Sequence, residues 1–135
     1  LHSLQHSFPT RRSSDLNRIP KESSIFNNDA KTIVISEENN DSEDSNLIFE
    51  TIDFDGNIAE EITKILFKHN IQSIIIEGGR QMLQTFIDAN IWDEARVFKG
   101  NITFEDGTKA PSLHSKLIKK QTILNDELLI FRNHD

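Results

Sequence analysis

The feature of this sequence that most constrains its fold is an apolar run that ends in two glycines. Residues 73–77 read Ser-Ile-Ile-Ile-Glu, and three consecutive isoleucines without alternation predict a strand buried on both faces, as in a parallel sheet. Gly78 and Gly79 end the run. A helix is predicted directly after them, up to about Asn90, because one face collects the apolar residues Met82, Leu83, Phe86 and Ile87. A buried strand that passes through a tight turn into a helix is typical of α/β folds.

The stretch before this run also alternates between strand and helix. Residues 31–36 and 47–52 are short, β-rich runs that predict two strands. Asn57, with Glu60 three residues later, resembles a capping box and predicts a helix that runs to about His69. The apolar stripe of this helix consists of Ile58, Ile62, Ile65 and Leu66.

The C-terminal part of the sequence is rich in β-forming residues. Residues 94–98 predict a further strand, and two runs at 117–124 and 127–132 flank Asn125-Asp126 and predict a hairpin. Together these patterns predict an α/β fold with a mixed, mostly parallel sheet, flanking helices and a C-terminal β-hairpin.

The composition limits the class of protein. With 135 residues the chain has room for one domain, and its net charge of -7 argues against nucleic-acid binding, which relies on clustered Lys and Arg. The chain contains no cysteine, which excludes disulfides, a thiolate nucleophile and a cysteine zinc site. No apolar run approaches the roughly 20 residues of a membrane-spanning helix. We therefore expect a soluble, cytoplasmic protein that binds neither nucleic acid nor membrane.

Residues 1–16 differ from the rest of the chain. They show neither helical nor strand periodicity and carry a net charge of +1, which leaves -8 for residues 17–135. Codons for residues 7–16, Ser-Phe-Pro-Thr-Arg-Arg-Ser-Ser-Asp-Leu, can be read from the end of a common short-read sequencing adapter. We therefore interpret residues 1–16 as a non-native segment, with translated adapter at 7–16, joined to a native part at 17–135. A disordered native tail is the alternative.

The end of the apolar run is the best candidate for a ligand site. Gly78 and Gly79 would let a ligand approach the backbone, and the N-terminus of the following helix offers unpaired N–H groups and a positive dipole end to an anion. In open α/β sheets, ligands bind outside the carboxyl ends of strands, where this turn lies. Glu77 would add a carboxylate that accepts hydrogen bonds from ligand hydroxyl or N–H groups. The spacing matches no phosphate-binding motif, so a plain strand–helix turn with a solvated Glu77 is an equally good interpretation.

Other polar and aromatic residues have simpler interpretations. His69, His114 and His134 lack the spacing of metal ligands, and the acidic stretch at 37–46 lacks the EF-hand pattern and is expected to be a solvated loop, so no metal site is predicted. His69 is expected to interact favourably with the C-terminal end of its helix. Trp92 is expected to anchor the core. An exposed strand face is expected to carry Lys116, Lys119 and Lys120.

An ordered set of motifs resembles one enzyme family. Residues 74–83, 86–88 and 91–98 resemble the reductase domain of the bifunctional riboflavin-biosynthesis deaminase–reductase, with its apolar strand, Glu-Gly-Gly, inward-facing helix residues and Asp-Glu strand. Residues 17–20, Asn-Arg-Ile-Pro, match as well. Four further matches lie in a tail that resembles Bacteroidetes-type versions of the domain: Phe104, Gly107, Ala110 and Pro111. The resemblance covers essentially all of residues 17–135.

This resemblance implies a fold, a reaction and a site. The family has a dihydrofolate-reductase-like fold, uses NADPH to reduce the ribosyl group of 5-amino-6-(5-phosphoribosylamino)uracil to its ribityl form, and usually works as a homodimer. By position, Glu77 resembles the substrate-contacting glutamate. The segment that resembles the one holding the NADPH phosphates consists of Gly78, Gly79, Arg80, Gln81, Met82, Leu83, Gln84 and Thr85. The resemblance assigns no catalytic residue.

The sequence departs from the family on its N-terminal side. The family's reductase begins with a strand carrying a Ser-x-Asp-Gly-type motif and with a Gly-x-x-Thr-Val-x-x-Asp-x-Pro nucleotide loop, and neither occurs before residue 31. The zinc-binding cysteines of the deaminase are absent too. We therefore expect an N-terminally truncated part of the reductase that is inactive by itself. The alternatives are a fragment that only binds nucleotide, and another dihydrofolate-reductase-like enzyme that acts on a pyrimidine or pterin.

Overall fold

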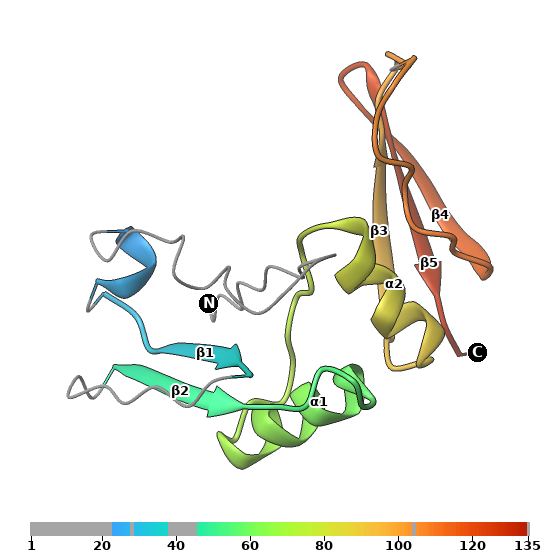
Figure 1. Ribbon diagram of the computed structural model, residues 1–135. Helices are drawn as coiled ribbons and strands as arrows, with labels where there is room; N and C mark the ends of the chain where they lie inside the picture. Colours follow the sequence, from blue (N-terminus) through green and yellow to red (C-terminus); the bar gives the residue numbers. More distant parts are fainter. Residues whose placement is uncertain (1–22, 28, 38–45, 104, 135) are drawn as a thin grey trace.

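The structure is a computed structural model that describes residues 23–27, 29–37, 46–103 and 105–134 (Figure 1). Its elements are a short 3-10 helix at Ser24–Phe26, then β1 (Thr32–Ser36), β2 (Leu47–Thr51), α1 (Ile58–Lys68), α2 (Arg80–Asp88), β3 (Glu94–Lys99), β4 (Lys116–Ile123) and β5 (Asp126–Arg132). Several predictions lie outside the described residues: those for residues 1–16, for residues 17–20, for Phe104 and for positions 38–45 of the acidic stretch.

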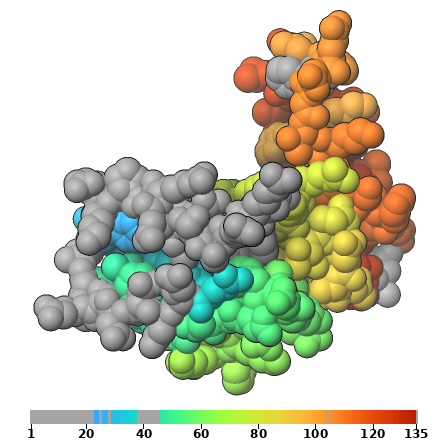
Figure 2. Space-filling model, viewed as in Figure 1, coloured from blue at the N-terminus to red at the C-terminus, as the bar shows by residue number. Residues whose placement is uncertain are grey.

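The described strands form two separate sheets. β1 and β2 pair in parallel, from Thr32 opposite Leu47 to Ser36 opposite Thr51. β5 lies between β3 and β4 and pairs with both in antiparallel fashion. Figures 1 and 2 show that the antiparallel strands project away from the part of the molecule that contains α1. The α/β class is confirmed, with the parallel and antiparallel strands in two sheets rather than one mixed sheet.

The predicted strand at residues 73–77 is the main difference from the sequence-based expectation. This segment is extended but forms no strand, and residues 72–77 make no backbone hydrogen bond within the described part of the chain. Ile74 and Ile76 pack against the core, whereas Ile75 is 74% exposed. A strand requires a neighbouring strand for its N–H and C=O groups, and none of the described strands lies beside this segment. The expectation of a strand buried on both faces is therefore wrong.

Helix α1 covers the parallel pair and forms the centre of the core. Its N-cap is Asn57, whose side-chain oxygen accepts a hydrogen bond from the N–H of Glu60 at 3.4 Å, as predicted. Its buried residues are Ala59, Ile62, Ile65 and Leu66. They belong to one cluster with Ile33 and Ile35 of β1 and with Met82 and Phe86 of α2. Each large apolar side chain buried in this way contributes about 1.5–3 kcal/mol, so this cluster fixes where both helices lie.

Both helices end in the same way. Asn70 and Asn90 follow the C-caps of α1 and α2, and each has a φ of 58°, in the left-handed region that Asn tolerates. The N–H of the next residue then donates to a carbonyl five positions earlier, at 2.9 Å from Ile71 and at 3.1 Å from Ile91. This is the Schellman arrangement, which satisfies carbonyls that the helix leaves unpaired.

The C-terminal hairpin is present but turns one residue earlier than predicted. β4 ends at Ile123 and β5 begins at Asp126, so Leu124 and Asn125 form the turn. Leu124 has a φ of 56° and is 94% exposed. All residues of β4 are exposed, which agrees with the expected exposure of Lys116, Lys119 and Lys120. Of the helices in the described part of the chain, none has the length and apolar character that a membrane crossing requires.

Candidate functional site

The glycine turn before α2 leaves open space beside the backbone. Gly78 has a φ of 127°, a conformation that side-chain-bearing residues rarely adopt, and this reverses the chain at the end of the extended segment. Gly79 is the N-cap of α2, with φ -70° and ψ 162°. Apart from the adjacent residues, no described atom lies within 4 Å of the place that a Cβ atom would take on either glycine. Among the described residues, no side chain would therefore have to move for a ligand to reach the backbone here.

The N-terminus of α2 is electrostatically suited to an anion. Gly79 supplies no side-chain cap, and the first turn contains no acidic residue. In the described part of the chain, the N–H groups of Arg80, Gln81 and Met82 donate no hydrogen bond, and the positive end of the helix dipole lies at the same place. Arg80 is exposed and adds a full positive charge. This combination fits a phosphate group.

The predicted site residues fall into two groups. The exposed group lies together at the turn: Glu77, Gly78, Gly79, Arg80 and Gln81. The side chains of the other group, residues 82–85, are buried or half-buried. Met82 is 3% exposed and belongs to the core, and Leu83 is half-buried. The Gln84 side chain is bonded to Ser112, and the hydroxyl of Thr85 donates to the Gln81 carbonyl at 2.9 Å. The side chains of the first group are the more accessible to a cofactor, whereas the buried Met82 side chain and the bonds of Gln84 hold the helix that presents them.

The described residues contain no cluster of His, Cys, Asp or Glu that could hold a metal ion. His69 lies beside Glu50 at the end of α1, and its Nε2 atom is 2.6 Å from a Glu50 carboxylate oxygen. His114 is exposed in the segment before β4.

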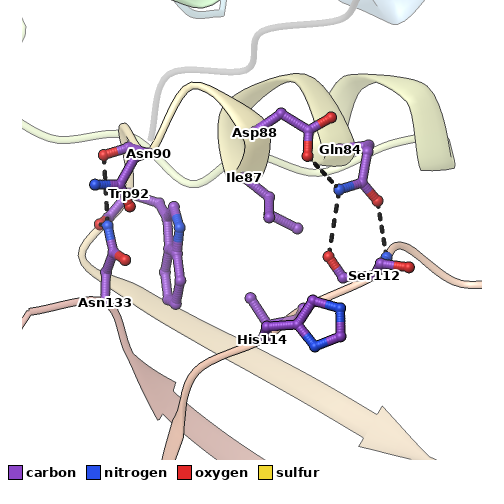
Figure 3. Close-up of a pocket in the computed structure, with 9 residues that line it drawn as sticks. Gln84, Ile87, Asp88, Asn90, Trp92, Ser112, His114 and Asn133 are labelled. Atoms are coloured by element: carbon purple, nitrogen blue, oxygen red, sulfur yellow. Dashed lines mark hydrogen bonds between the residues drawn. The ribbon is translucent and has the colours of Figure 1, made fainter.

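A concave feature lies at the other end of α2 (Figure 3). It is an open pocket of about 410 Å³ between the outer face of α2, the turn after it, residues 112–114 and Asn133. Trp92 lines this pocket and is half-buried, so the expectation of a core anchor is wrong. The lining comes from residues 84–92, residues 112–114 and Asn133, which are three segments far apart in the sequence, so no local motif could predict it.

Comparisons with known proteins identify a family and similar structures. The family model described as the RibD C-terminal domain matches residues 13–126. No curated protein matches the chain. Solved structures that share its fold include the following two. One is a diaminohydroxyphosphoribosylaminopyrimidine deaminase/5-amino-6-(5-phosphoribosylamino)uracil reductase from Thermotoga maritima, with a TM-score of 0.67 and 20% identity. The other is RibD from Acinetobacter baumannii, with a TM-score of 0.69 and 17% identity.

The similarity covers most of this chain but a minor part of those proteins. The matched region is 80% of this chain and 32% of the Thermotoga protein, and 85% of this chain and 34% of the Acinetobacter protein. The chain therefore spans about a third of the length of each. The structural likeness supports the dihydrofolate-reductase-like fold, and the family model covers well over half of the sequence. The chain belongs to the RibD C-terminal domain family.

Proposed function

We propose that the chain is part of a reductase that uses NADPH to reduce 5-amino-6-(5-phosphoribosylamino)uracil in riboflavin biosynthesis, in the cytoplasm and as a homodimer. The match to the RibD C-terminal domain over residues 13–126 supports the pathway. The name of the Thermotoga protein includes this reductase activity. The observation that carries the cofactor assignment is the uncapped N-terminus of α2 at an open glycine turn.

The residues of the turn fit a pyrophosphate group. In this proposal, the backbone N–H groups after Gly79 donate to phosphate oxygens, and Arg80 balances their charge. Met82 holds the helix in place through the core. Glu77, an exposed carboxylate before the glycine turn, accepts hydrogen bonds from the substrate. NADPH supplies the hydride when bound, while the protein supplies orientation and charge complementarity.

Substitution of Gly79 tests the cofactor site without weakening the fold. Asp is a favourable N-cap, and the backbone of Gly79 has the extended conformation that an N-cap residue adopts. Gly79→Asp should therefore keep or raise the Tm, while its carboxylate occupies the donors that phosphate needs. We expect NADPH affinity, measured by isothermal titration calorimetry, to fall at least tenfold.

Two control variants separate charge from structure. Gly79→Asn caps the helix without adding charge and should lower the affinity less than Gly79→Asp. Gly107→Asp adds the same charge at another open glycine and should leave the affinity unchanged. Unaltered NADPH binding by Gly79→Asp would reject the site.

The reaction itself is tested by NADPH oxidation. We expect no turnover of the pathway substrate by this chain alone, because the Ser-x-Asp-Gly-type motif and the nucleotide loop of the family's reductase do not occur before residue 31. Turnover by the chain alone would overturn this expectation. In a longer enzyme that contains this domain, Glu77→Gln should weaken substrate use, and unchanged kinetics would make Glu77 a solvated turn residue. Faster reduction of pterins than of the ribosyl-pyrimidine would favour a different reductase of this fold.

A further inference from the structure

The pocket at the C-terminal end of α2 has walls that hydrogen bonds hold in place. Gln84 clamps residue 112 onto the helix: the N–H of Ser112 donates to Gln84 Oε1 at 2.8 Å, and Gln84 Nε2 donates to the Ser112 carbonyl at 3.3 Å. Three residues later, the hydroxyl of Ser115 donates to the Arg132 carbonyl on β5. Leu113 and His114 are therefore held between two anchored points, opposite α2.

The other wall is anchored in a similar way. The side-chain amide of Asn133 donates to the Trp92 carbonyl at 2.9 Å and to the Asn90 carbonyl at 3.4 Å. The backbone N–H of Asn133 donates to the Asp93 carbonyl at 3.0 Å. These bonds fix the turn after α2, and with it the indole of Trp92, to the last strand. A ligand would meet a surface that is already formed, which lowers the cost of binding.

The lining of the pocket is part polar and part apolar, and it includes flat aromatic rings. The side chain of Ile87 points toward the space between the rings of Trp92 and His114 (Figure 3). Leu113 completes the apolar lining. Aromatic rings favour planar ligands through stacking, and the volume of about 410 Å³ is large enough for one small aromatic molecule.

The charge at this end of α2 favours a cation. Asp88 is the last residue of the helix, where the dipole already presents partial negative charge, and the last turn contains no basic residue. By contrast, the last turn of α1 contains Lys68. None of the residues that line the pocket is Lys or Arg. Gln84 Nε2 donates to Asp88 Oδ1 at 2.8 Å, and no described residue donates to Oδ2.

We propose that this pocket binds a planar aromatic cation, such as an aryl amidinium or a protonated amino-heterocycle, stacked against Trp92 and paired with Asp88. The site is separate from the glycine turn and does not depend on the proposed reductase function. Since Asp88 and His114 are exposed, solvent screens the pairing, and we expect a Kd on the order of 1 mM for a small fragment.

Trp92 provides a direct readout because it is the only tryptophan in the chain. Its single indole N–H resonance can be followed by NMR during titration with benzamidinium and with benzoate, which have similar size and opposite charge. We expect a saturable shift with benzamidinium and at least tenfold weaker binding of benzoate. The absence of a saturable shift with benzamidinium, or equal binding of the two, would overturn the proposal.

Variants then locate the charge. Asp88→Asn keeps an oxygen for the Gln84 amide, so the clamp is preserved, and we expect benzamidinium affinity to fall about tenfold. Asp126→Asn makes the same change at the far hairpin and should leave the affinity unaltered. The indole resonance without ligand verifies that each variant keeps the native turn. Equal affinity in the native chain and in Asp88→Asn would show that the proposed pairing is absent.

Discussion

The imidazole of His69 lies 2.6 Å from the carboxylate of Glu50, between Nε2 and Oε1, and this contact joins the C-terminal end of α1 to β2. Lys68 donates from Nζ to both carboxylate oxygens, at 2.8 and 2.9 Å. The side chains of Glu50 and His69 are each only 13% exposed. Glu50 therefore connects the helix to the parallel sheet at a place that solvent reaches poorly.

This contact predicts a loss of stability in acid. Burial alone would raise the pKa of Glu50, but the hydrogen bonds and charges of Lys68 and His69 outweigh it and lower the pKa below its ordinary value. A lowered pKa stabilises the fold above the unfolded-state value, about 4.3 for Glu, and the contribution disappears as the pH falls through the folded-state value. We expect Glu50→Gln to lower the free energy of unfolding by about 1–2 kcal/mol at pH 7 and by less at pH 3.

Urea unfolding at both pH values measures this difference. Glu61→Gln is the matched control, because Glu61 pairs with Lys64 on the exposed side of α1 and should contribute little. An equal effect of Glu50→Gln at pH 7 and pH 3 would contradict the prediction.

Leu124 is a strained residue at the hairpin turn. An L-residue in the left-handed region costs about 1–2 kcal/mol, and Leu124 loses almost no packing when replaced because it is exposed. Leu124→Gly should therefore raise the free energy of unfolding by about 0.5–1 kcal/mol, measured as a Tm increase of a few degrees. Asn125→Gly is the control and should bring no gain, since Asn125 has a negative φ. A lower Tm for Leu124→Gly would refute the strain argument.

Met82 should act through stability rather than through cofactor contact. Because its side chain is buried in the core, Met82→Ala should lower the free energy of unfolding by about 2–4 kcal/mol, whereas Met82→Leu should cost less than about 1.5 kcal/mol. Gln81→Ala, at the exposed neighbouring position, should change stability by less than about 0.5 kcal/mol. Chemical denaturation gives these values, and a stable Met82→Ala variant with reduced NADPH affinity would instead support direct contact.

The unpaired segment at 72–77 should exchange its amide hydrogens quickly. Its N–H groups have no described backbone acceptor, in contrast to those of Ile65 and Leu66 inside α1. Hydrogen exchange followed by NMR should show rapid exchange at Ile74, Ile75 and Ile76 and strong protection in α1. Comparable protection of the two regions would mean that another strand pairs with this segment.

Local patterns were sufficient to predict most of the helices and strands. The stripes of α1 and α2, the Asn57 cap and the β-rich runs of β1, β2 and β3 depend on neighbouring residues in the sequence, and all are present in the structure. The glycine turn likewise follows from its own residues, since Gly78 adopts a conformation that suits glycine.

What sequence could not provide depends on residues far apart in the chain. Whether Ile74–Ile76 form a strand depends on a partner, which no periodicity reports. The roles of Met82 and Gln84 were carried over from a linear motif, although a helix directs successive residues to different faces. Trp92 faces a pocket because Asn133, 41 residues away, fixes the turn that carries it.

The shared ending of the two helices shows that the direction in which the chain leaves a helix does not decide whether the next segment forms a strand. Asn70 and Asn90 bend the chain identically, and in both cases an isoleucine follows and an extended segment leaves the helix. After Asn90 that segment becomes β3, because β5 lies beside it. After Asn70 it pairs with none of the described strands. The helix end therefore sets only the direction of the departing chain. Whether the departing segment becomes a strand depends on a pairing partner, which can come from a distant part of the sequence.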